Sequence, residues 1–187
     1  GFDLFKFVKM LSDSKPTMLE WLQSDILYYG DKSPVFVEFA LHQFNPISVY
    51  HHYKSMCRQN YIKYLKSNSE VTYKKYLYAM RGLINAKWIA LNNTVLPPLS
   101  LQETMSELRK VGGMPTSILD KTEEIIRLKK VGKEKEIIAK IPQIDEYIES
   151  YLKDDSDAPV TAKRHGLNKE LDDEIRRILL CGDRIPL

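Results

Sequence analysis

Apolar residues follow a helical period along almost the whole chain, and no stretch alternates apolar and polar residues as a half-buried strand does. Leu4, Phe7, Val8 and Leu11 recur at the i, i+3, i+4, i+7 spacing that places them on one helix face. Similar patterns continue to residues 168–180, and no repeat of fixed length relates them. The 187 residues are therefore predicted to fold as an all-α bundle of about eight helices with no significant sheet.

Residues that favour helix N-termini precede several of these patterns. Asp3 can accept hydrogen bonds from free backbone N–H groups, and Asn45 and Ser100 precede the expected helices 46–66 and 101–111. Thr17 and Glu20 have the spacing of a capping box, which predicts a short helix beginning at Thr17.

The chain divides by composition into three parts. Residues 1–153 are predicted to form the main helical unit, residues 154–167 a polar linker or mobile loop, and residues 168–187 a C-terminal helix and tail. The sequence opens at Gly1 without a Met and with an apolar pattern already under way, so we expect it to be part of a longer protein.

Cysteine count and hydropathy exclude several classes of protein. The two cysteines, Cys57 and Cys181, are too few for a disulfide framework or a zinc site, and they favour the reducing cytoplasm. No apolar run approaches the roughly 18 to 20 residues that cross a membrane, so no membrane partner is expected.

Positive charge is concentrated in the middle of the sequence. The formal charge of the whole chain is only +3, yet residues 45–98 carry eight Lys and Arg against Glu70 alone. Seven of the eleven tyrosines lie in the same stretch. A basic segment rich in tyrosine between mildly acidic ends is the strongest functional signal in the residues themselves.

Helical spacing gathers part of this charge into stripes. If the expected helices 46–66 and 72–91 pack antiparallel through their apolar faces, the stripes meet along the junction of the two helices. Arginine offers a planar fork, lysine a point charge and tyrosine a stacking face, which together suit a triphosphate or a nucleic-acid backbone. The stripes contain His52, Asn60 and Lys63 on the first helix, and Lys74, Tyr78 and Arg81 on the second.

Each of these residues also has a simpler, non-functional interpretation. Charged residues on bundle helices usually face solvent, Cys57 is expected in the core, and His51 and His52 diverge by about 100° and cannot hold one metal ion together. The Asp-x-Asp pair formed by Asp155 and Asp157 lies in the expected loop and is interpreted as solvated. No Gly-rich phosphate loop or nucleophile elbow occurs, so we assign no catalytic residue and no metal ligand to this chain.

Three segments nevertheless resemble a known family. Residues 14–24 are similar to a segment of the form "Asn-Pro … Glu-Trp-Leu-x-Ser-Pro", and residues 52–61 to "His-Tyr-x-x-Met-Ala-x-x-Asn-Tyr". Residues 74–89 resemble "Lys-Lys-Tyr-Leu-Tyr-x-x-Arg … Ala-x-x-Trp-Ile". Order and spacing match over about residues 1–153. The family is that of predicted nucleotidyltransferases in the DNA polymerase beta superfamily, associated with RNA repair.

The resemblance implies an activity whose catalytic signature is absent from these residues. Family members transfer a nucleoside monophosphate from a triphosphate to an acceptor, with Mg²⁺ held by an Asp-x-Asp strand that follows a Gly-Ser turn. That motif lies upstream of the segment that matches here, so a missing N-terminal catalytic domain is the expected partner. Lys15 and Asp25 replace the family's Asn and Pro, and residues 154–187 have no recognised counterpart. We therefore expect this chain by itself to be inactive and to hold no cofactor.

These arguments lead to one main hypothesis and one alternative. The main hypothesis is the helical, nucleotide-facing part of such an enzyme. The alternative is a non-catalytic helical interaction module, or an RNA-binding one, that uses the surface of residues 45–98. The expected phosphate or nucleotide contacts are Lys75, Arg81, His52, Asn60 and Lys63, with Lys54, Arg58 and Lys74 as an outer electrostatic rim.

Overall fold

The computed structural model describes residues 3–27, 33–94, 96–133, 135–160 and 169–180, and within these ranges the protein is all-α, as predicted. The only sheet in the described residues has two strands of two residues each. None of the described helices is long and apolar enough to cross a membrane. The helices are α1 (Leu4–Ser12), α2 (Pro16–Gln23), α3 (Pro34–His42), α4 (Pro46–Tyr61), α5 (Tyr73–Leu91), α6 (Leu101–Lys110), α7 (Thr116–Leu128), α8 (Pro142–Lys153) and α9 (Lys169–Leu180).

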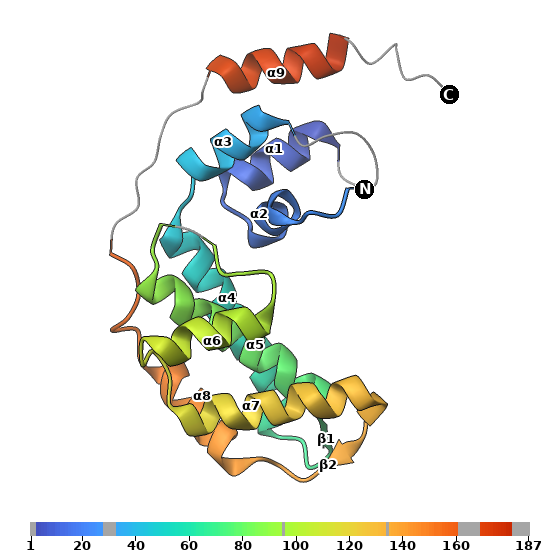
Figure 1. The fold of residues 1–187 in the computed structure, drawn as a ribbon, viewed down its shortest axis with the longest axis vertical. Coiled ribbons are helices and arrows are strands. Elements are labelled where there is room, and N and C mark those ends of the chain that lie inside the picture. Colours follow the sequence, from blue (N-terminus) through green and yellow to red (C-terminus); the bar gives the residue numbers. More distant parts are fainter. Residues whose placement is uncertain (1–2, 28–32, 95, 134, 161–168, 181–187) are drawn as a thin grey trace.

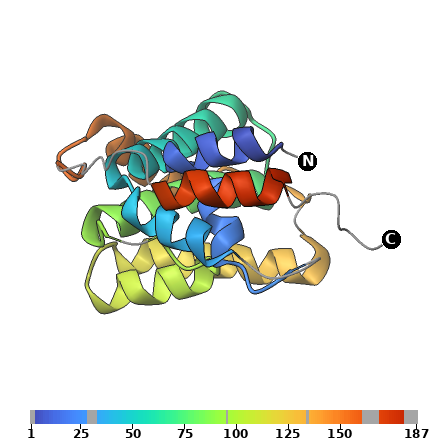
Figure 2. The ribbon, with the colours of Figure 1, turned by 90° about the horizontal axis from the view of Figure 1, so that it is seen from above.

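The helices form two groups that α4 connects (Figure 1). α1, α2 and α3 lie at one end, and α9 returns from the far end of the sequence to pack on α3 (Figure 2). Leu171 of α9 is fully buried there, and the Ser33 hydroxyl at the start of α3 donates to Glu174 at 2.7 Å. α4 to α8 form the other group, which contains most of the residues expected to bind phosphate.

α4 and α5 are the central pair and pack antiparallel, which meets the condition under which the sequence analysis placed the charged stripes along one junction. Their closest approach is at Gly82, where an added Cβ atom would lie 2.6 Å from the Cys57 backbone nitrogen and 2.7 Å from the Tyr53 carbonyl oxygen. Such distances are shorter than any ordinary van der Waals contact, so only glycine fits here. Cys57 itself is buried, and burial raises the pKa of its thiol to about 12.

A tight connection joins α4 to α5 at the end of the pair far from α1. α4 continues into a π-helical turn, Ile62–Lys66, and the chain then reverses through β1 (Val71–Thr72). β1 pairs antiparallel with β2 (Ile137–Ile138), with Val71 opposite Ile138. This small sheet fixes the segment before α8 against the start of α5.

The observed helix caps confirm three predictions and contradict one. Asp3, Asn45 and Ser100 each accept a hydrogen bond from the backbone N–H three residues later. The capping box at Thr17 is wrong, because α2 begins at Pro16 and its N-cap residue makes no side-chain cap. Proline suits the first helical position, since its missing N–H needs no partner there.

Replacing Gly82 with alanine tests the close contact of α4 with α5. Helix propensity alone predicts that Gly82→Ala stabilises the protein by about 1 kcal/mol. We expect instead that Gly82→Ala lowers the free energy of unfolding by about 1–3 kcal/mol, because the added Cβ forces the backbones of α4 and α5 apart. Urea unfolding followed by circular dichroism measures the change.

Ala90→Gly on the half-buried end of α5 is the control, and we expect it to cost about 1 kcal/mol through propensity. A Gly82→Ala protein as stable as the wild type, or more stable, would contradict the close contact.

Candidate phosphate-binding surface

The structure divides the cationic side chains of α4 and α5 between two sides of the helix pair. Lys54 and Arg58 face α8 and the segment after it, where they bond to Asp155 and to the Leu152 carbonyl oxygen. Arg81 lies instead beside α2, whose Glu20 it approaches. The eight candidate residues therefore do not surround a single point.

Lys63 and Lys75 come together around one aromatic ring at the far end of the pair. The Lys63 ammonium lies 5.0 Å from the centre of the Tyr64 ring, and the Lys75 ammonium lies 5.5 Å from it. Cation–π contacts hold both lysines near the ring without neutralising them. Among the described residues no carboxylate forms an ion pair with either lysine, so this cluster keeps an uncompensated double positive charge.

A second cluster forms where α2 meets the middle of α4 and α5. The Tyr53 hydroxyl donates to Glu20 Oε1 at 2.8 Å, and the Arg81 guanidinium lies 3.8 Å from the same oxygen. His52 is near this carboxylate, but burial and the charge of Lys15 hold its pKa below the usual value. His52 is therefore neutral near pH 7 and offers a hydrogen bond rather than a charge.

The two remaining exposed or half-buried candidates, Asn60 and Lys74, belong to neither cluster. Asn60 lies between His52 of α4 and Lys63 of the π-helical turn that follows it, and its amide nitrogen donates to the Met56 carbonyl oxygen at 2.8 Å. Lys74 is half-buried at the start of α5. Lys75 and Arg81 are six positions apart on α5, which is about 9 Å along the helix axis and about 120° around it. We refer to the two clusters, together with Asn60, as the strip.

The assignment of Lys54 to an outer rim is wrong. Lys54 is only 4% exposed, and its ammonium donates to Asp155 at 2.7 Å, to the Tyr50 hydroxyl at 3.2 Å and to the Asp154 carbonyl oxygen. The ammonium also lies 4.6 Å from the centre of the Tyr151 ring. A buried lysine with all its donors used stabilises the structure and is not accessible to a ligand.

The acidic segment after α8 is held by ion pairs in its described part, residues 154–160, while the Asp155 side chain remains exposed to solvent, as expected. Asp157 accepts from Lys87 at 2.8 Å and from the Tyr50 hydroxyl at 2.7 Å, while Asp155 is bound by Lys54. Lysine contacts lower the affinity of a carboxylate for a cation, so this Asp-x-Asp pair does not fit a magnesium site. No group of three or more potential metal ligands occurs in the parts of the chain that the structure describes.

Three important residues escaped the sequence analysis. Tyr64 lies where α4 becomes π-helical, so its contact with Lys75 depends on a change of helix type. Glu20 was assigned to a capping box, and Lys87 was counted only as part of the net charge. The acidic residue that pairs with Arg81 in the described part of the chain, Glu20, comes from another helix, which no pattern within residues 45–98 reveals.

Comparison with known proteins identifies the family. The family model RlaP, described as the RNA repair pathway DNA polymerase beta family, matches residues 1–177, and the chain belongs to this family. The chain is also 30% identical over 182 residues to the uncharacterized protein YcgL of Bacillus subtilis (strain 168). That alignment covers 96% of this chain and 67% of YcgL. No solved structure matches.

The role of Lys54 is tested by Lys54→Met, which keeps the apolar stem and removes the ammonium. Hydrogen bonds to charged groups contribute about 1.5–3 kcal/mol each, so we expect the free energy of unfolding to fall by at least that amount. The ammonium also holds the pKa of Asp155 below its usual value, and NMR titration of the variant is expected to show this pKa rising.

Lys63→Met is the matched control, because Lys63 is exposed and is expected to change stability by less than about 0.5 kcal/mol. Equal effects of the two substitutions on stability would mean that Lys54 is not a structural residue.

Proposed function

We propose that these 187 residues are the helical, phosphate-facing part of a nucleotidyltransferase that moves a nucleoside monophosphate from a triphosphate to an acceptor. Membership of a polymerase-beta-type family supports this class of reaction. The observation that carries the proposal is the pairing of Lys63 with Lys75 around Tyr64 without a carboxylate. An uncompensated pair of ammonium groups on a rigid helix pair favours an anionic ligand.

Each side chain of the strip then has a distinct task. Lys63 and Lys75 attract the phosphates as point charges, because no carboxylate among the described residues pairs with their ammonium groups. Arg81 is only loosely paired with Glu20, so its guanidinium can turn to a phosphate and bind it through two N–H groups. His52 and Asn60 contribute hydrogen bonds without adding charge.

The proposal separates binding of the nucleotide from its chemistry. In-line nucleotidyl transfer needs carboxylates that hold metal ions against the phosphates. The only Asp-x-Asp pair in these residues is bound by lysines, and the sequence has no Gly-Ser turn. The carboxylates are therefore proposed to come from residues outside this sequence, and these 187 residues are expected to bind a triphosphate without transferring the nucleotide.

Charge reversal on the strip tests the proposal. Lys75→Glu and Arg81→Glu are each expected to weaken the binding of ATP and of inorganic tripolyphosphate by about tenfold or more, because each removes a charge-assisted contact and adds repulsion. Isothermal titration calorimetry at low ionic strength measures both affinities.

Lys110→Glu is the control, since Lys110 is an exposed lysine of α6 and produces the same change in net charge. If all three variants fold and lose affinity equally, the effect reflects net charge and the strip is not the binding site.

A salt series separates this function from the RNA-binding alternative. An RNA-binding module releases several counterions, so its affinity for single-stranded RNA falls steeply as salt rises. We expect the triphosphate to show a shallower dependence, because it contacts fewer cations. Tight, steeply salt-dependent RNA binding with no affinity for tripolyphosphate would favour the alternative.

A further inference from the structure

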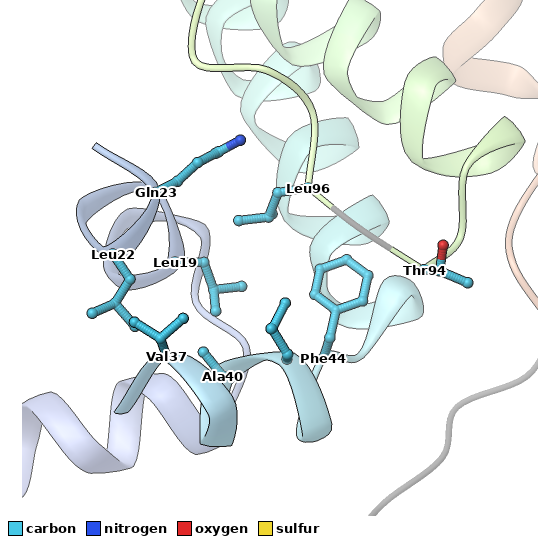
Figure 3. Close-up of a pocket in the computed structure, with 9 residues that line it drawn as sticks. Leu19, Leu22, Gln23, Val37, Ala40, Phe44, Thr94 and Leu96 are labelled. Atoms are coloured by element: carbon cyan, nitrogen blue, oxygen red, sulfur yellow. The ribbon is translucent and has the colours of Figure 1, made fainter. Parts of the chain in front are cut away.

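An apolar pocket of about 260 Å³ lies between helices α2 and α3 and the segment that joins α5 to α6. Figure 3 shows its side chains directed toward a common space, with Leu96 facing α2 and α3 across it. Aliphatic groups supply most of the wall, and the Phe44 ring forms one side. The apolar lining residues come from α2, from α3 and the turn after it, and from the joining segment: Leu19, Leu22, Val37, Ala40, Leu41, Phe44 and Leu96.

Two polar side chains, Gln23 and Thr94, complete the lining. The Gln23 amide nitrogen donates to the Pro97 carbonyl oxygen at 3.4 Å, a long hydrogen bond that a ligand can displace. A mostly apolar wall with a few polar groups is typical of small-molecule sites, whose volumes for whole drug-sized ligands begin near 300 Å³. This pocket therefore fits one ring system better than a complete nucleotide.

α2 connects this pocket to the strip of cationic side chains. Leu19 and Gln23 line the pocket, and Glu20 lies between them in sequence and approaches Arg81 on a neighbouring face of the helix. Neighbouring faces of one helix are separated by no more than its diameter of about 10 Å. Lys75 and Arg81 follow one another along α5, and the pocket lies on the other side of α2, whose Glu20 approaches Arg81.

We propose that this pocket binds the base of the nucleoside triphosphate whose phosphates lie along Arg81 and Lys75. The proposal rests on the proposed function and adds the place of the base. The Phe44 ring and the leucines offer an apolar surface for a flat heterocycle, as stacking sites for bases do. Gln23 supplies both a donor and an acceptor, which can discriminate between base edges.

The experiment compares the four ribonucleoside triphosphates with inorganic tripolyphosphate, using this chain and calorimetry. A bound base contributes affinity that tripolyphosphate lacks, so at least one nucleotide is expected to bind about tenfold more tightly. Val37→Phe fills the pocket from a half-buried position and is expected to abolish this advantage while leaving tripolyphosphate binding unchanged. Val35→Phe is the matched control, on the same helix but outside the pocket lining.

Thr94→Trp blocks the pocket from an exposed position and decides the result if Val37→Phe does not fold. If tripolyphosphate binds through Lys75 and no nucleotide binds more tightly, the base pocket is overturned while the proposed function stands. A nucleotide advantage that survives both blocking variants places the base elsewhere and also overturns the pocket. If neither tripolyphosphate nor nucleotides bind, the proposed function itself fails and the pocket proposal with it.

Discussion

The contact of α4 with α5 at Gly82 is the constraint on which the rest of the structure depends. The Cβ position of Gly82 is within 3 Å of backbone atoms of Tyr53 and Cys57, so the two helices lie as close as backbones allow. At this contact the close backbones leave no room for side chains between the helices, and the charged residues of the pair emerge on its two outer sides. The pair therefore separates its own positive charge into two groups with different surroundings.

One group is neutralised by the same polypeptide, and the other is not. Lys54 and Lys87 are bound by Asp155 and Asp157, which fastens the chain after α8 to the central pair. Within the ranges that the structure describes, Lys63 and Lys75 contact the Tyr64 ring and form no ion pair. A buried lysine needs a compensating partner, whereas an exposed one does not, and the acidic segment after α8 supplies partners to Lys54 and Lys87. The other side of the pair is the one to which we assign the proposed ligand.

Helical periodicity and cap residues predicted the fold class and most helix boundaries correctly, because both signals act within one or two turns. The failures have a common cause. Glu20 has the spacing of a capping residue, yet it bonds to Tyr53, 33 positions away. Asp155 is exposed, as expected, but its pairing with Lys54, 101 positions away, was not foreseen. Contacts over such separations depend on how the helices pack, which no local pattern encodes.

The sequence by itself determined that the chain is helical, that its positive charge lies between residues 45 and 98, and that it resembles a nucleotidyltransferase family. Only the tertiary structure decided which of those cations are accessible. Lys54 and Lys63 are residues of the same type in one continuous helical segment, yet Lys54 is buried and bound to Asp155 while Lys63 is exposed beside Tyr64. The physical reason is that desolvation and ion pairing depend on neighbours from other helices, and those neighbours are brought together only by folding.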